Sequence, residues 1–246
     1  MKFTKGYWMN LPGVETADVV QIREARLNRS ASTDAADAAG DSLWLYAVNY
    51  GYDGRGMGGP VIELTVSSPR PDVIRVEAVH FAGSRKKDPQ FELETEPCPL
   101  EYAESEDGRK ITVKSGNTSL VITKNPASFA FFYGDRPLTA VGERYGKSMI
   151  SYVTAPDGVY MRAQLDVGLG EKLYGLGERF TPFVKNGQVV DIWNEDGGTC
   201  TEIAYKNIPF YISNRGYGVF VNSADRVSYE LCSEMVTRAQ FSVPGE

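Results

Sequence analysis

Short segments with alternating hydrophobic and polar residues recur along most of the chain. Val61–Val66 and Val73–Val79 alternate in places, and Leu43–Val48 is rich in aliphatic and aromatic residues. A period of two and an excess of β-branched and aromatic residues are typical of half-buried strands. Further strands of this kind are expected at residues 110–114, 119–123, 129–133, 159–167, 208–213, 217–222, 227–231 and 238–243.

Turn-forming residues separate these segments at short intervals, as at Asp107-Gly108, Gly134-Asp135 and Asn214-Arg215-Gly216. Glycine, asparagine and aspartate are common in turns because they accept backbone conformations that other residues avoid. The chain shows no convincing amphipathic helix of about 12 residues or more. Many short strands joined by regular turns predict an all-β fold, an antiparallel β-sandwich.

Three segments depart from the strand pattern. Residues 28–40 are rich in Ala, Ser and Asp, which indicates a surface loop, and residues 49–59 hold five glycines, which indicates a long hairpin connection. Leu173–Thr201 combines glycine, tryptophan, aromatic and acidic residues with little strand periodicity. Because binding residues concentrate on loops held by a rigid scaffold, we expect Leu173–Thr201 to contain the functional loop.

The composition narrows the class of protein. The 246 residues, 42% of them hydrophobic, suit one large all-β domain or two smaller ones. The net charge of −6 and the scattered basic residues disfavour binding to nucleic acids or anionic membranes. No apolar stretch is long enough for a membrane span or a signal peptide. Three cysteines without CxxC spacing indicate reduced thiols, for which the cytoplasm is the simplest location.

His80 is the only histidine, and it falls within the strand expected at residues 73–82. One imidazole cannot supply a histidine acid–base pair, and it excludes most zinc sites. Gly175 and Gly177 are spaced as in a phosphate loop, but the Gly-Lys-Ser/Thr ending is missing. We therefore predict a structural role for His80, and we expect neither a typical zinc site nor a phosphate loop.

Four carboxylates, Glu178, Asp191, Glu195 and Asp196, lie close together in the sequence. Glycosidases use two carboxylates that flank the scissile bond. Proximity in sequence does not establish such a pair. The other interpretation is that Glu178 pairs with a neighbouring arginine while the other three are solvated.

Trp193 stands beside Asn194 and close to Asp196. Sugars present apolar faces to aromatic rings and hydroxyl groups to amides and carboxylates, so this group suits sugar binding. A tryptophan that plugs one end of the sandwich explains the pattern equally well.

Five blocks together resemble a known family, and they occur in a fixed order at residues 173–180, 186–188, 193–199, 204–211 and 214–219. They begin Leu-Tyr-Gly-Leu-Gly-Glu-Arg-Phe and include Trp-Asn-Glu-Asp-Gly-Gly-Thr. In order and spacing they are similar to the N-terminal domain of glycoside hydrolase family 31, particularly its bacterial α-xylosidase branch. The resemblance is strong from about residue 160 to residue 243. It implies that residues 1–246 form a galactose-mutarotase-like β-sandwich that precedes a (β/α)8 barrel.

The resemblance also implies where catalysis occurs. In the family, an aspartate nucleophile and an aspartate acid/base both come from the barrel. Their motifs, of the Lys-Thr-Asp-Phe-Gly and Trp-x-Asp-Met-Asn types, do not occur in this sequence. We therefore expect a fragment that stops before the last strands of the sandwich, with no catalytic residue of its own. The parent reaction would be retaining hydrolysis of a non-reducing-end α-xyloside or α-glucoside, with no cofactor.

A role for the loop at residues 179–201 follows from the same resemblance. A family loop reaches over the barrel mouth, and its aspartate, here Asp196, contacts the leaving-group sugar. Trp193 and Asn194 are the other expected substrate-binding residues. We assign Glu178 and Arg179 to an internal ion pair that shapes the loop.

The expected partners are the sugar substrate and the barrel, and a homo-oligomer remains open. Two alternatives also remain open: a free-standing carbohydrate-binding sandwich, and a structural domain that supports the barrel. A module that ends on an unpaired strand edge is disfavoured. Substitution of Trp193 and Asp196 would separate substrate contact from purely structural support.

Overall fold

The computed structural model describes residues 2–6, 9–30, 40–49, 59–80, 93–144, 147–148, 150–197, 199 and 201–245. These residues form strands, turns and bends, and their sheets are antiparallel. Within them no helix is long and apolar enough to cross a membrane. The predicted all-β class is confirmed. The loops expected at residues 28–40 and 49–59 lie mostly outside the described residues.

The chain divides into two compact units, and the divisions fall within strands β1 (Glu15–Asp18) and β13 (Ile150–Ala155). Unit 1 contains the described residues of 1–16 and 153–245. Unit 2 contains the described residues of 17–84 and 93–152.

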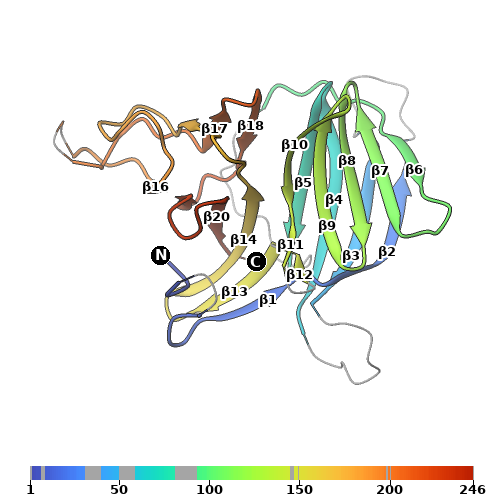
Figure 1. Ribbon diagram of the computed structural model, residues 1–246, viewed down its shortest axis with the longest axis horizontal. Coiled ribbons are helices and arrows are strands. Elements are labelled where there is room, and N and C mark those ends of the chain that lie inside the picture. The colour runs from blue at the N-terminus through green and yellow to red at the C-terminus, as the bar shows by residue number, and fades with distance from the viewer. Residues whose placement is uncertain are drawn as a thin grey trace. The chain divides into compact units, whose positions relative to one another are not determined.

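Two antiparallel sheets make up most of unit 2 (Figure 1). One sheet has the order β2-β3-β4-β5, with β2 Gln21–Asn28, β3 Ser42–Val48, β4 Val61–Arg70 and β5 Val73–Val79. The other has the order β10-β9-β8-β7-β6, with β6 Glu101–Glu104, β7 Lys110–Ser115, β8 Thr118–Lys124, β9 Ala127–Tyr133 and β10 Arg136–Val141. A short hairpin pairs β11 (Glu143–Arg144) with β12 (Lys147–Ser148).

The core of unit 2 lies between its two sheets. Alternate residues of β3 and β4, such as Leu45 and Leu64, are fully buried, as are Ile111 of β7 and Leu120 of β8. The two sheets also meet through the hydroxyl groups of Ser68 and Ser115, 2.6 Å apart. This packing is that of the β-sandwich predicted from the alternating pattern.

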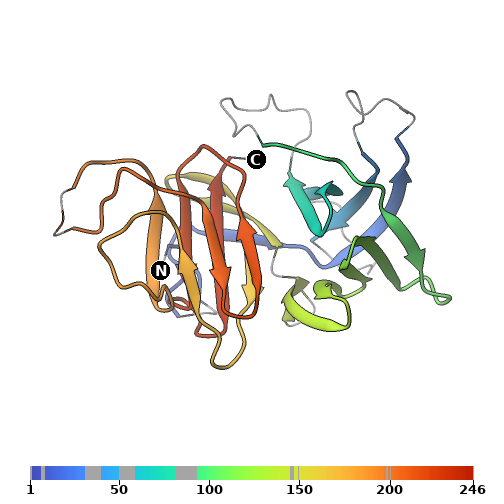
Figure 2. The same cartoon turned by 90° about the horizontal axis from the view of Figure 1, so that it is seen from above.

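Unit 1 contains a six-stranded and a three-stranded sheet, seen from above in Figure 2. The larger sheet has the order β1-β13-β14-β20-β19-β16, with β14 Gly158–Asp166, β16 Gln188–Ile192, β19 Val227–Leu231 and β20 Arg238–Pro244. The smaller has the order β15-β17-β18, with β15 Leu173–Gly175, β17 Phe210–Ser213 and β18 Tyr217–Phe220.

Two buried tyrosines link the sheets of unit 1. Tyr211 of β17 and Tyr229 of β19 pack edge to face, with ring centroids 6.3 Å apart. The hydroxyl group of Tyr229 donates to the carbonyl oxygen of Pro209 at 2.9 Å. This contact holds the start of β17 against the larger sheet.

A row of buried polar side chains crosses the larger sheet. Gln164 of β14 donates to Gln240 of β20 at 2.6 Å, and Gln240 donates to Glu230 of β19. The backbone nitrogen of Lys2 donates to the other oxygen of Glu230 at 3.0 Å. Burial, followed by the charge of Glu234 and a hydrogen bond with it, raises the pKa of Glu230 to about 7.

Most predicted strands match observed ones, and β19 has the predicted bounds. Residues 173–201, in which the sequence shows little strand periodicity, contain the short strands β15 and β16, which the sequence did not predict. β15 has only three residues, and β16 places two valines in succession, so neither shows a clear period of two. β2 was missed because several of its residues are charged and exposed.

His80 directly follows β5, and its ring stacks on that of Tyr152 with centroids 4.0 Å apart. This placement agrees with a structural role. Cys98 and Cys232, the two cysteines among the described residues, are free thiols.

Candidate functional site

The loop region of unit 1 begins with a strained turn after β15. Gly175, Leu176 and Gly177 have φ angles of 110°, 68° and 88°. Leu176 accepts this uncommon conformation while its side chain is fully buried. A β-carbon on Gly177 would stand 2.0 Å from the carbonyl oxygen of Lys206, so only glycine fits there. The turn therefore brings residues 176–178 against the backbone of residues 206–210.

Arg179 follows this turn and connects four parts of unit 1. Its guanidinium group donates to the carbonyl oxygens of Leu176 at 3.0 Å, Asp191 at 2.9 Å and Glu202 at 3.1 Å. It also donates to the side-chain oxygen of Asn207. Burial lowers the pKa of Arg179, although the charges of Asp191 and Glu202 oppose this shift. The planar guanidinium group can bind several oxygens at once, which a lysine cannot do in the same geometry.

Asn207 continues the network towards the candidate sugar-binding residues. Its side-chain amide donates to the carbonyl oxygens of Trp193 at 2.8 Å and Ala204 at 2.7 Å. The same amide donates to the side-chain oxygen of Asn194 at 3.0 Å, and the backbone nitrogen of Asn207 donates to that oxygen at 3.2 Å. Asn207 thus joins the two sides of the loop, residues 193–195 and residues 204–207.

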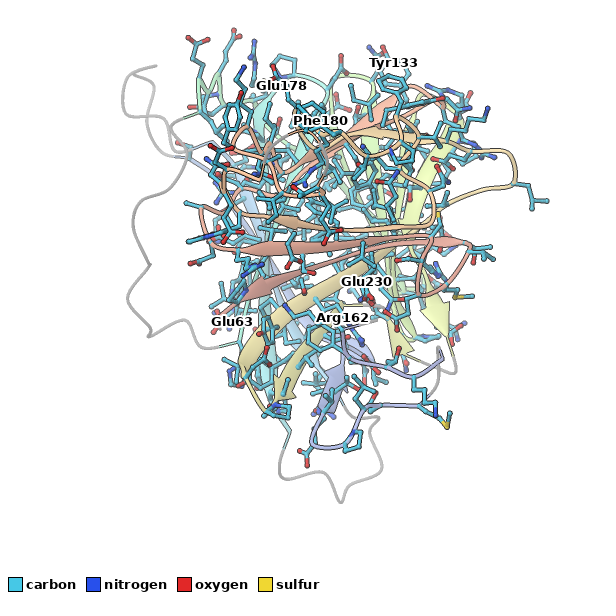
Figure 3. The ribbon with its side chains drawn as sticks, turned by 90° about the vertical axis from the view of Figure 1, so that its left-hand side faces the viewer. Glu63, Tyr133, Arg162, Glu178, Phe180 and Glu230 are labelled. Carbon is cyan, nitrogen blue, oxygen red and sulfur yellow. The ribbon has the colours of Figure 1, made fainter. Side chains whose placement is uncertain are left out.

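The expected ion pair between Glu178 and Arg179 is not the arrangement observed. Glu178 pairs instead with Lys206 at 3.0 Å, and the hydrogen bond that Lys206 donates to Glu178 raises the pKa of Lys206. Arg179 binds neutral oxygens. The reason is geometric: the turn directs Glu178 to the exposed Lys206, whereas Arg179 extends into the loop. Figure 3 views the molecule from the side of this loop and labels Glu178 and Phe180.

The three predicted substrate-binding residues, Trp193, Asn194 and Asp196, lie within a stretch of four residues on the loop after β16. Trp193 keeps 48% of its surface exposed, so it does not plug a buried end of the sandwich. Asn194 forms a bridge with Ala204, and its side-chain oxygen binds Asn207. Asp196 is exposed, two residues further along. The structure brings Trp193 and Asn194 to Asn207 and presents Asp196 at the surface.

The other carboxylates of this region do not share one arrangement. Asp191 pairs with Arg226 at 3.2 Å, and Glu195 is exposed. Nowhere in the described part of the chain do three His, Cys, Asp or Glu side chains gather in a group that could hold a metal ion. The site therefore offers an aromatic ring, an amide and carboxylates at a surface, which can bind hydroxyl groups and an apolar sugar face.

An exposed apolar face lies on the outward side of the small sheet. Tyr174 and Phe183 contact each other with ring centroids 5.1 Å apart, and Phe183 is 78% exposed. Ile212 pairs with Tyr174 across the strands and is also exposed, as is Phe220. Contiguous exposed apolar residues mark interaction surfaces in soluble proteins. We call Tyr174, Phe183, Ile212 and Phe220 the apolar face.

The assignment of Asp196, Trp193 and Asn194 to substrate binding stays a prediction. Sequence reasoning did not identify the hydrogen-bond network of Arg179 and Asn207 beside them. Both residues lie in the blocks that resemble family 31. Their contacts join positions 28 residues apart, which no local pattern predicts.

Comparison with known proteins decides the family. The model of the glycosyl hydrolase 31 N-terminal galactose mutarotase-like domain matches residues 63–230, more than half of the chain. The chain belongs to this family.

Curated relatives of this family 31 domain are α-xylosidases. It is 39% identical to an α-xylosidase of Emericella nidulans and 38% identical to α-xylosidase XylQ of Lactiplantibacillus pentosus. Both comparisons cover 100% of the chain, but only 32% and 31% of the relatives. The chain thus spans about a third of the length of these relatives.

Solved structures support the fold. The family 31 domain aligns with the cycloalternan-forming enzyme of Listeria monocytogenes with a TM-score of 0.73 and 18% identity, over 96% of this chain and 20% of that one. It aligns with a family 31 dextranase of Flavobacterium johnsoniae with a TM-score of 0.68 and 16% identity, over 93% of this chain and 25% of that one.

Proposed function

We propose that the chain is the N-terminal domain of a retaining α-xylosidase-like hydrolase that acts on non-reducing-end α-xylosides. In this role its loop at residues 179–201 shapes the leaving-group side of the active site, and catalysis belongs to the rest of the protein. The observation that supports this most strongly is the identity of 39% and 38% to two α-xylosidases along the whole chain. An α-glucosidase would use the domain in the same way.

The loop's geometry supports a contact with the leaving-group sugar. Trp193 is half exposed, and Asp196 follows it on the same exposed segment. An aromatic ring can cover the apolar face of a sugar while a carboxylate accepts hydrogen bonds from its hydroxyl groups. The network of Arg179 and Asn207 gives this segment a defined position, as a binding site requires.

The apolar face supports attachment to a larger protein. Four large apolar side chains lie on the outward side of the small sheet, and the curated relatives are about three times longer than this chain. We propose that the (β/α)8 barrel of the parent protein covers this face. A free-standing sugar-binding module would leave it exposed.

The test is the substitution Asp196→Ala in the full-length protein, assayed with an α-xylosyl disaccharide and with p-nitrophenyl α-xyloside. Losing a hydrogen bond to a charged group costs about 1.5–3 kcal/mol, so kcat/KM for the disaccharide should fall on the order of 10- to 100-fold. The aryl substrate lacks the sugar hydroxyl groups at this position and should change much less.

Two results would contradict the proposal. Equal losses on both substrates would indicate a role near the bond that breaks, or misfolding. No loss on either would leave the loop without substrate contact. A parallel assay with p-nitrophenyl α-glucoside decides between α-xylosidase and α-glucosidase activity.

A further inference from the structure

We infer that Arg179 and Asn207 are positioning residues that set the strength of leaving-group recognition, an inference that rests on the proposed function. They form a latch, which we define as the hydrogen bonds from Arg179 to Asn207 and from Asn207 to Trp193 and Asn194. Neither residue needs to touch the sugar. Their role is to hold the backbone of residues 193–196 in one place.

The latch is anchored at the turn after β15 and at β16. Arg179 binds the carbonyl oxygen of Leu176 in the strained turn and that of Asp191 in β16. Gly177 in the same turn lies against the backbone of Lys206 and Asn207. Arg179 is therefore attached to the sheets of unit 1, and its hydrogen bonds limit the motion of the loop relative to these sheets.

The latch holds the backbone of the loop that carries Trp193 and Asn194. Both donors of the Asn207 side-chain amide are used, since that amide contacts three oxygens, two of which belong to Trp193 and Asn194. The backbone nitrogen of Glu195 donates to the carbonyl oxygen of Ala204 at 3.0 Å, on the other side of the loop. Asp196 comes next in the chain. A displacement of Asn207 would move the backbone that presents Trp193 and Asp196 together.

The residue types of the latch suit its hydrogen bonds. Arg179 has three separate nitrogen atoms that reach oxygens from four residues, and a lysine has one. Asn207 is both acceptor for Arg179 and donor to the loop, and an aspartate could accept but not donate. Arg179→Lys and Asn207→Asp replace side chains by others of nearly equal size. Each therefore removes the hydrogen bonds on one side of the latch only.

The experiment uses Asn207→Asp in the full-length protein, with Asn214→Asp as the matched control. Asn207→Asp keeps the acceptor for Arg179 but places a carboxylate among three oxygen acceptors. In the control, the side-chain oxygen of Asn214 accepts from the backbone nitrogen of Lys172 at 2.9 Å, and a carboxylate preserves this bond. A second pair is Arg179→Lys with Arg226→Lys as control, because Arg226 also binds Asp191 but is exposed.

Two measurements are made on each variant: hydrogen exchange of peptides that cover residues 193–197, and kinetics with a disaccharide and an aryl xyloside. For Asn207→Asp and Arg179→Lys we expect exchange at least about 10-fold faster in these peptides, because local opening becomes easier. We expect kcat/KM for the disaccharide to fall on the order of 10-fold, mainly through KM, and the aryl substrate to change less than about 2-fold. The controls should show neither effect.

The outcomes separate the inference from the function on which it rests. If hydrogen exchange of residues 193–197 is unchanged in both Asn207→Asp and Arg179→Lys, the latch does not hold this segment and the inference is wrong. Faster exchange without loss of the disaccharide preference would show that the loop's position does not set recognition, which also overturns it. If Asp196→Ala discriminates between the substrates and the latch variants do not, only the inference is wrong. If none of them discriminates, the proposed leaving-group role is wrong, and the inference falls with it.

Discussion

The α-carbon of Gly177 lies so close to the carbonyl oxygen of Lys206 that an added β-carbon would stand 2.0 Å from it. We therefore predict that Gly177→Ala destabilises the domain by at least about 2 kcal/mol, because it adds a clash to an unfavourable φ angle. Urea denaturation followed by fluorescence measures the change.

Gly187→Ala is the control for this prediction. Gly187 has a φ angle of 85°, close to the 88° of Gly177, but a β-carbon there would meet nothing within 4 Å. Gly187→Ala should lower the free energy of unfolding by only about 1 kcal/mol, because it adds backbone strain but no clash. Equal losses in the two variants would show that the contact with Lys206 does not matter.

Glu171 is the basis of the second prediction. Its carboxylate, 1% exposed, accepts hydrogen bonds from Tyr217 at 2.6 Å, from the backbone nitrogen of Gly168 at 2.7 Å and from Ser213, and it pairs with Arg215. Glu171→Ala would leave these donors without their acceptor. A buried polar group that loses its hydrogen-bond partner costs about 1–3 kcal/mol, so we expect a loss of at least this size in the free energy of unfolding.

The control for Glu171 is Glu101→Ala on β6. The side chain of Glu101 is 73% exposed, and its pairing with Lys114 is 3.7 Å long. Surface substitutions of this kind usually change stability by less than about 0.5 kcal/mol. A similarly small effect at Glu171 would mean that its network contributes little.

Because of Glu230, we expect the free energy of unfolding to depend on pH. Its pKa of about 7 in the folded state lies above the ordinary value of 4.5, so the folded state holds the proton more tightly than the unfolded state. The contribution to stability is therefore complete below about pH 4.5 and is lost as the pH rises through about 7. The loss is on the order of 3 kcal/mol, and it belongs to the coupled pair with Glu234.

Glu230→Gln tests this dependence, because a glutamine cannot ionise. The variant should lose less stability between pH 5 and pH 8 than the unaltered chain, by about 2 kcal/mol in urea denaturation. Parallel curves for the two proteins would show that Glu230 does not ionise in this range.

We expect substitution of Trp193 to weaken sugar binding much more than it lowers the stability of the domain. Because its ring is half exposed, Trp193→Ala should lower the melting temperature by only a few degrees, which corresponds to about 1 kcal/mol. In the full-length protein, KM for a disaccharide should rise on the order of 10-fold, since the apolar contact with the sugar is lost. Trp193→Phe should restore part of the affinity. A large loss of stability with unchanged KM would support a purely structural role.

The last prediction concerns activity. The 246-residue chain should not hydrolyse p-nitrophenyl α-xyloside, because neither aspartate motif of the family's barrel occurs in its sequence. Turnover by a purified sample, above that of a sample inactivated by heat, would contradict the assignment of catalysis to the rest of the protein.

The sequence predicted the strands whose side chains alternate between core and solvent, such as β4, where every second residue from Ile62 to Ser68 is buried. It failed at β15 and β16, because a strand of three to five residues has too few positions to show a period. Residue type and resemblance both point to Trp193, Asn194 and Asp196, and their contact with a sugar stays a prediction. Arg179 was assigned to the wrong partner, since only the folded turn decides whether its side chain meets a carboxylate or backbone oxygens.

The row of Gln164, Gln240 and Glu230 has a consequence for how the large sheet assembles. These residues stand directly opposite one another in the ladders β14–β20 and β20–β19. A slip of one position along β20 would remove Gln240 from between its partners and turn it to the other side of the sheet, where Phe241 and Tyr229 now pack. The hydrogen bonds of this row form only in the observed alignment, so they add to the specificity with which the alternating pattern sets the register of β14, β20 and β19.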